Sequence, residues 1–236
     1  MKSSKLDIPN CEDCQNKGGV FSCLSKQDKA ILGEDKGNNF YKKGQVIFYE
    51  GNHPHGLYCI FNGKVKISKL GDEGKEQIVR ISGNADTLGY RSLLCNEPYK
   101  ATATAIEDSY ICYLSKKKFF ELLESNNTLC LNTIQLLARE LRQSEQQLVD
   151  ITQKSVRERI AEVLMQLKGK FGTKPDGITL DIRLTRREIG DMAGVTTETT
   201  IRTLSDLNKE EIIHINGKDI QILKPDHLHR IANIED

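Results

Sequence analysis

Hydrophobic and polar residues alternate in short runs between residues 40 and 114. Runs such as FYKKGQVIFYEG, QIVRI and SYICYL are rich in Ile, Val, Tyr and Phe, and glycine-containing turns separate them. A period of two places every second side chain on one face of a β-strand. Asn62-Gly63, between two of the runs, is a dipeptide typical of a two-residue hairpin turn. The pattern therefore predicts an antiparallel barrel or sandwich of short strands.

The period changes after residue 125, where a long stretch contains neither glycine nor proline until Gly169. Within it, hydrophobic positions recur at alternating spacings of three and four residues, which is the seam of a coiled coil. A single amphipathic helix carries a wider apolar stripe, so an ordinary core helix is the weaker alternative. We predict a dimerisation helix over residues 126–153. Its seam consists of Ile134, Leu137, Leu141, Ser144, Leu148 and Ile151.

Residues 184–208 read LTRREIGDMAGVTTETTIRTLSDLN. Thr185 and Glu188 have the spacing of a capping box, which starts a helix. Gly194 supplies a residue for which a positive φ costs little, and Thr196 is a good N-cap for a second helix. A helix, a glycine turn and a second helix make up the helix-turn-helix motif.

The second helix of such a motif lies in the DNA major groove, with its N-terminal end at the base edges. Arg202 can donate to guanine and Glu198 can accept from cytosine, although the two could also form an ordinary surface ion pair. We expect Ile201, Leu204 and Leu207 on the buried side of this helix. The predicted base contacts are Thr197, Glu198, Thr200 and Arg202, and the predicted phosphate contacts are Arg186, Arg187 and Lys218.

The segment EEIIHINGKDIQIL alternates on both sides of Asn216-Gly217 and predicts a β-hairpin, the wing of a winged helix. The chain is therefore expected to have an α+β fold. We predict a cysteine-rich arm over residues 1–24, an antiparallel β-barrel sensor domain over 25–125, the dimerisation helix over 126–153 and a winged helix-turn-helix DNA-binding domain over 154–236.

Length, charge and composition further restrict the possible domain organisation and function. The chain has 236 residues, enough for two domains, and a net charge of +1. DNA binding would therefore depend on local clusters of charge rather than on the overall balance. No apolar run is long enough for a membrane helix and the start carries no secretory signal, so we expect a cytoplasmic protein. No nucleophile–base pair or phosphate loop indicates an enzyme, and His53 and His55 are interpreted as loop surface.

The chain contains seven cysteines, an odd number. In a reducing cytosol this favours metal ligation, redox chemistry or burial over a disulfide framework. Cys11, Cys14 and Cys23 lie close together in CEDCQNKGGVFSC, a polar segment with no helical or strand period. Cysteines in such a segment are rarely core residues. Cys59, Cys95 and Cys130 are interpreted as packing residues instead.

The order of β-barrel, heptad helix and winged helix-turn-helix resembles the family of the cyclic-AMP receptor protein and FNR. The segment LTRREIGDMAGVTTETTIRTL is similar to the family's recognition motif. The resemblance implies a barrel of the cyclic-nucleotide-binding jelly-roll type in a homodimer that binds palindromic double-stranded DNA. It also implies contact with RNA polymerase, through a loop that corresponds to Gly71–Gln77.

Family members that bind cyclic nucleotides carry G-E-x-x-L followed by R-[ST]-A, in which the arginine pairs with the cyclic phosphate. Here Gly89 is followed by Tyr90, and Lys100-Ala101 stands in place of Arg-Ser. Arg91 is present, but at a different position. The comparison argues against a cyclic nucleotide as the effector.

FNR-type members hold an iron–sulfur cluster with three N-terminal cysteines and a fourth in the last barrel strand. EDSYICYL places Cys112 at the matching position. The resemblance implies that oxygen is sensed through a [4Fe–4S] cluster, although Cys14 and Cys23 are further apart than in most FNR-type arms. Zinc on the same thiolates, a thiol–disulfide switch and a small molecule in the barrel are the alternatives. The implied cluster ligands are Cys11, Cys14, Cys23 and Cys112.

Overall fold

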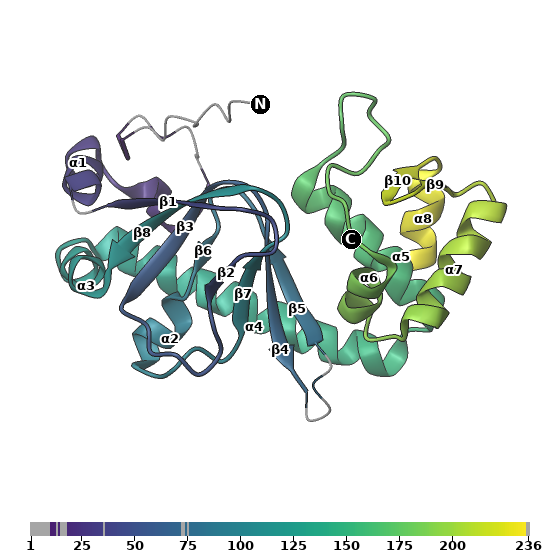
Figure 1. Cartoon of the computed structure of the whole chain (residues 1–236), viewed down its shortest axis with the longest axis horizontal. Coiled ribbons are helices and arrows are strands. Elements are labelled where there is room, and N and C mark those ends of the chain that lie inside the picture. The colour runs from purple at the N-terminus through teal and green to yellow at the C-terminus, as the bar shows by residue number, and fades with distance from the viewer. Residues whose placement is uncertain are drawn as a thin grey trace. The chain divides into compact units, whose positions relative to one another are not determined.

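The computed structural model describes residues 10–12, 14, 18–34, 36–71, 74 and 76–234. The described chain forms two compact units (Figure 1). The first comprises residues 1–70 and 80–141, and the second comprises residues 71–79 and 142–236. A short 3-10 helix, η1 (Val20–Cys23), and helix α1 (Lys26–Glu34) precede the strands.

The described residues form two four-stranded sheets, which belong to the first unit except for the start of β5, and this confirms the predicted jelly-roll-like fold. The first sheet has the order β1 (Gly37–Tyr41), β8 (Ser109–Ser115), β3 (Gly56–Asn62) and β6 (Thr87–Leu88). The second has the order β2 (Val46–Phe48), β7 (Thr102–Ala105), β4 (Val65–Leu70) and β5 (Glu76–Ser82). Helix α2 (Tyr90–Cys95) follows β6, and α3 (Lys116–Ser125) follows β8.

The predicted hairpin at Asn62-Gly63 is wrong. The preceding strand, β3, pairs with β8 and β6, whereas the following strand, β4, pairs with β7 and β5. The chain therefore turns from one sheet to the other at this point. Gly63 has φ 122° and lies against Ser109 so closely that a Cβ atom would have no room. The sequence correctly predicts a turn at Asn62-Gly63. Which strands pair on either side of it depends on residues far away in the chain.

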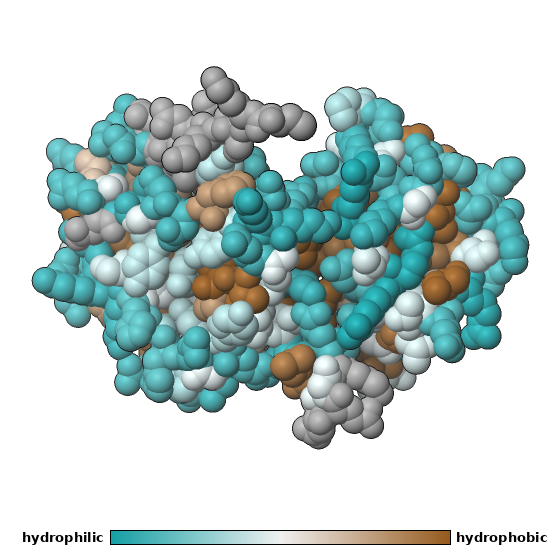
Figure 2. Space-filling model, in the orientation of Figure 1, coloured by the Kyte–Doolittle hydropathy of each residue, from teal (hydrophilic) through white to brown (hydrophobic). Residues whose placement is uncertain are grey.

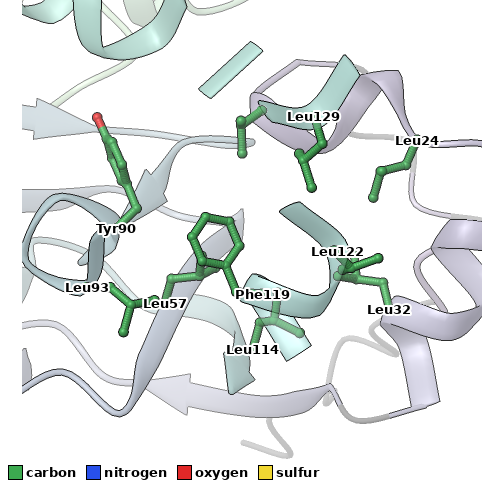
Figure 3. Packing of buried hydrophobic residues seen from close by; sticks show 10 residues of the cluster. Leu24, Leu32, Leu57, Tyr90, Leu93, Leu114, Phe119, Leu122 and Leu129 are labelled. Carbon is green, nitrogen blue, oxygen red and sulfur yellow. The ribbon is translucent and has the colours of Figure 1, made fainter. Parts of the chain in front are cut away.

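Two hydrophobic clusters stabilise the first unit. One lies between the sheets and includes Ile60, Val65 and Ile111, with less than 1 % of each exposed. The other packs α3 and the start of the next helix against the first sheet, with Phe119 next to Leu57 and Leu114 (Figure 3). Because both clusters use β3 and β8, these strands carry buried side chains on both faces.

Helix α4 (Asn127–Gln153) confirms the predicted long helix. Four apolar positions of the predicted seam are exposed in the single chain, with 56 % of Ile134, 62 % of Leu141, 67 % of Leu148 and 46 % of Ile151 accessible. Leu137, also in the seam, packs against the hydrophobic cluster of Figure 3 instead. Near its start the helix therefore contacts the first unit, which we call the sensor unit after its predicted role, and further along it presents apolar side chains to solvent.

The second unit contains α5 (Val156–Phe171), α6 (Arg186–Ala193), α7 (Thr197–Lys209), the hairpin β9 (Ile213–Asn216) with β10 (Asp219–Ile222), and α8 (Pro225–Ala232). Thr185 and Glu188 form the predicted capping box at the start of α6, and Gly194 ends that helix with φ 64°. The helix-turn-helix and the hairpin wing are thus confirmed. Ser155 and Glu158 form a second capping box, which starts α5.

Among the residues that the structure describes, none of the helices has the length and apolar character needed to cross a membrane. On the face shown in Figure 2, hydrophilic residues cover most of the surface and hydrophobic residues form separate patches.

Gly190 allows α6 and α7 to approach closely. A Cβ atom at this position would lie 2.5 Å from the Thr200 hydroxyl and 2.9 Å from the Val195 carbonyl oxygen. We predict that Gly190→Ala lowers the free energy of unfolding by about 1–3 kcal/mol through overpacking, measured by urea denaturation.

Gly169 in α5 is the matched control, because a Cβ atom there would meet nothing within 4 Å. Gly169→Ala should raise the free energy of unfolding by about 0.5–1 kcal/mol, since alanine is the better helix former. Equal effects of the two substitutions would contradict the close helix crossing.

Candidate thiol site and DNA interface

The predicted barrel cysteine, Cys112, lies on the central strand β8, directly opposite Cys59 on β3. Directly opposite residues of an antiparallel pair point to the same face, with Cβ atoms about 4.5–5.5 Å apart. The pairing of β3 with β8 therefore brings two thiols side by side. The register continues with Leu57 opposite Leu114 and Tyr58 opposite Tyr113.

Four cysteines line one cavity on this face of the sensor unit. Cys11 and Cys14 come from the N-terminal segment, and Cys59 and Cys112 come from the sheet. The structure thus brings together three of the four cysteines predicted as ligands and adds one that was interpreted as packing. As they stand, no three His, Cys, Asp or Glu side chains of the described residues are close enough together to hold a metal ion.

The fourth predicted ligand, Cys23, is outside the set of residues that line this cavity. Its thiol donates to the Val20 carbonyl oxygen at 3.4 Å within η1. Its side chain packs against the hydrophobic cluster of Figure 3. Cys95 is exposed, so its interpretation as a packing residue is wrong, whereas Cys130 is half-buried. Neither lines the cavity.

Burial makes three thiols of this cavity, those of Cys11, Cys59 and Cys112, hard to ionise. Desolvation raises the pKa of Cys11 and raises the pKa of Cys112 to about 11, while the positive charge of Lys36 partly opposes both shifts. Desolvation, followed by the neighbouring Cys112, raises the pKa of Cys59 further. At neutral pH these groups are therefore thiols, and a bound metal would have to displace their protons.

A second polar cluster in the same unit surrounds Glu140 of α4. Its carboxylate accepts hydrogen bonds from Arg80 of β5, from the Tyr90 hydroxyl and from Arg91 of α2, with Arg91 Nε at 2.7 Å. Burial opposes ionisation of Glu140, but Arg80 and the hydrogen bonds from Tyr90 and Arg91 lower its pKa overall. This cluster ties the sheet and α2 to the long helix.

The positions that correspond to a cyclic-nucleotide cassette have other contacts. Arg91 is paired with Glu140, and Lys100 forms an exposed ion pair with Glu97 at 3.3 Å. Tyr99 stacks on Phe48 with ring centroids 3.9 Å apart, inside the cluster between the two sheets.

Helix α7 presents one face of its N-terminal half to solvent. Thr197, Glu198 and Arg202 are exposed, as predicted for residues that meet base edges. The predicted exposure of Thr200 and the predicted burial of Ile201 are both wrong. Thr200 is fully buried and donates to the Thr196 carbonyl oxygen at 2.9 Å, so it is not available for a base contact. Ile201, expected in the core, has 52 % of its surface exposed.

Helix geometry explains why Thr200 is buried and Ile201 is exposed. The two fully buried leucines of α7 are Leu204 and Leu207. Thr200 precedes them by four and seven residues and therefore shares their face, whereas Ile201 is next to Arg202 on the other side.

The three predicted phosphate contacts differ in their surroundings. Arg186 donates to the Gly217 carbonyl oxygen at 2.9 Å and so joins α6 to the hairpin turn. The Arg187 side chain is 59 % exposed, and its Nε lies 3.9 Å from Asp191 Oδ2. Lys218 is exposed at the hairpin turn. Arg187 and Lys218 remain accessible to a ligand, while Arg186 also holds the wing against the helix-turn-helix.

Comparison with known proteins agrees with these two units. The cyclic nucleotide-binding domain matches residues 38–126, and the Crp-like helix-turn-helix domain matches residues 158–231. The cAMP-activated global transcriptional regulator CRP of Haemophilus influenzae is 31 % identical over 77 % of this chain and 82 % of that protein. The fumarate and nitrate reduction regulatory protein of Vibrio cholerae is 28 % identical over 82 % of this chain and 77 % of that protein.

The solved structure of FixK2 from Bradyrhizobium japonicum has the same fold, with a TM-score of 0.76 and 24 % identity. The match covers 85 % of this chain and 99 % of the FixK2 chain. The sensor unit and the winged helix-turn-helix thus define a DNA-binding transcription regulator, not an enzyme. The chain belongs to the CRP/FNR family.

The raised pKa of Cys112 predicts slow alkylation in the reduced, metal-free protein. At pH 8 about 0.1 % of a thiol with a pKa near 11 is ionised, against roughly a quarter of an ordinary cysteine. We expect iodoacetamide to modify Cys112 at least about tenfold more slowly than the exposed Cys95, measured by mass spectrometry of peptides. Equal rates at the two cysteines would contradict the burial of the cavity.

Proposed function

We propose that this regulator responds to oxygen or redox state through a [4Fe–4S] cluster held by thiolates of its sensor unit. The observation that carries the proposal is the cavity into which Cys11, Cys14 and Cys112 are brought together. Four cysteine thiolates are the usual ligands of such clusters, and three of the predicted set line this one space. Cys23 completes the set that the family resemblance implies.

The surroundings of the thiols favour a negatively charged group. Lys29 and Lys36 line the same cavity, and their positive charges would offset those of thiolates. The cavity is formed partly by the N-terminal segment, so ligation would fix that segment on the sheet. When bound, the cluster would supply an oxygen-labile iron–sulfur unit, and the chain's own contribution is to position the thiols and shield them.

A thiol–disulfide switch is the second candidate. The register of β3 and β8 favours it, because Cys59 and Cys112 are directly opposite neighbours. A cyclic nucleotide finds less support. The Haemophilus relative is described as cAMP-activated, but here Arg91 is engaged by Glu140.

A homodimer is also part of the proposal. Ile134, Leu141, Leu148 and Ile151 are all exposed in the single chain and follow the heptad spacing, so a second copy of α4 would cover them. Two copies of α7 about one DNA turn (~34 Å) apart would read a palindrome. Ser144 gives the seam a polar position, which weakens a dimer less than paired carboxylates would.

Contact with RNA polymerase and a cytoplasmic location complete the proposal. The loop Gly71–Gln77, expected to contact the polymerase, lies partly outside the described residues.

Metal content distinguishes the candidates. We predict that protein purified without oxygen holds about four iron and four sulfide per chain, with a broad absorption near 400 nm that bleaches in air. Cys112→Ser should abolish both, whereas Cys95→Ser, the matched control outside the cavity, should retain them. One zinc and no iron would refute the cluster, and neither metal would leave the thiol switch as the leading candidate.

Base readout by α7 is tested with a palindromic duplex selected from a random library. Arg202→Ala should weaken specific binding by about 1–3 kcal/mol and relax the preference at one base pair, measured by fluorescence anisotropy. Lys209→Ala, at the far end of the same helix, should leave the base preference unchanged. Unchanged affinity of Arg202→Ala would show that α7 is not the reading helix.

A further inference from the structure

We propose that Cys59, in place of Cys23, is the fourth thiolate of the metal site. This inference rests on the proposed function, because it assigns a ligand to the same thiol site. It differs from the ligand set that the family resemblance implies, which takes three thiols from the N-terminal segment and one from the barrel. Here two would come from the N-terminal segment and two from the sheet.

The register of β3 and β8 places two thiols of the sheet side by side. Cys59 and Cys112 are directly opposite on the central strands β3 and β8. They therefore point to the same side of the sheet at a separation suited to bridging by one inorganic unit. Both are held by backbone pairing, so this half of the site exists before any metal binds.

The cavity brings two further thiols to the same side of the sheet. Cys59 lines it together with Cys11, Cys14 and Cys112, which gives four thiols in one space. Lys29 and Lys36 line the same cavity and supply positive charge. Four thiolates are the full complement of a tetrahedral soft-metal site or of a [4Fe–4S] cluster, so no further ligand is required.

The alternative ligand is engaged elsewhere. Cys23 ends the short helix η1, where its thiol donates to the Val20 carbonyl oxygen. Cys11, Cys23 and Cys59 all pack against the hydrophobic cluster around Phe119, but only Cys11 and Cys59 also line the cavity.

A hydrogen-bond donor also stands beside Cys59. The Thr87 hydroxyl of β6 lies 4.0 Å from the Cys59 sulfur, within reach of a hydrogen bond to it. Thr87 is directly opposite Cys59 in the β3–β6 pair and is buried. Donors to the ligand sulfurs stabilise thiolates and tune metal sites, and the arrangement of Cys59 supplies one from a rigid strand.

The test replaces single thiols in the full chain under anaerobic conditions. Cys59→Ser, Cys59→Ala, Cys23→Ser and Cys112→Ser are each reconstituted with iron and sulfide, and separately titrated with cobalt(II). Iron and sulfide are counted per chain, and the thiolate-to-cobalt charge-transfer absorption reports the number of thiolate bonds. Far-UV circular dichroism checks that each variant is folded. If Cys59→Ser does not fold, the folded Cys59→Ala variant replaces it in the test.

We expect both Cys59 variants to lose iron and sulfide to the level of Cys112→Ser, with a weaker cobalt charge-transfer band. Cys23→Ser should match the wild type. Full metal content in a folded Cys59 variant, or loss of metal in folded Cys23→Ser, would overturn the assignment while leaving the proposed function intact. Wild-type protein that binds neither iron nor cobalt would overturn both.

Discussion

The pairing of β3 with β8 is the constraint on which the sensor unit depends. Its register sets Leu57 against Leu114 and Cys59 against Cys112, so one face of the pair carries both a hydrophobic surface and two thiols. The other face carries Ile60 and Ile111 into the cluster between the sheets. Because side chains alternate with a period of two, a slip of one residue would move the thiols to the opposite face. Core packing therefore enforces the geometry of the candidate metal site.

The same face of the sheet also anchors the helix that leads out of the sensor unit. Phe119 and Leu122 of α3 and Leu129 of α4 belong to the cluster that covers Leu57 and Leu114 (Figure 3). A few turns further along α4, Glu140 is held by Arg80, Tyr90 and Arg91. A change in the N-terminal segment over the thiols would act on residues next to this cluster, since Cys11 and Cys59 also pack against it. The long helix then provides a continuous element by which such a change could alter a dimer seam.

Hydrophobic periodicity predicted most elements of the fold, because alternation and heptad spacing are local properties of the chain. The capping box at Thr185 and the glycine turn at Gly194 were recognisable for the same reason. What escaped prediction depends on distant residues. Asn62-Gly63 looks like a hairpin whether or not its flanking strands pair, and Gly190 gains its importance only where α7 crosses it.

The candidate functional residues follow the same division. The exposure of Thr197, Glu198 and Arg202 could be predicted from their position within a motif, but the faces of Thr200 and Ile201 differ by a single step around the helix. Cys112 was identified from a local segment. Cys59 could not be identified in this way, because only the register of β3 on β8 brings it beside Cys112. The resemblance to FNR-type arms implies Cys23 instead, which the structure packs in η1.

The central claim is that the state of the thiol site controls the affinity for DNA. The most direct test is fluorescence anisotropy with a labelled palindromic duplex, on one anaerobic sample measured before and after exposure to air. The account predicts that air weakens specific binding at least about tenfold, or ~1.4 kcal/mol, and that Cys112→Ser binds as weakly in both conditions. Equal affinity before and after air, in wild-type protein shown to have lost its iron and sulfide, would contradict it.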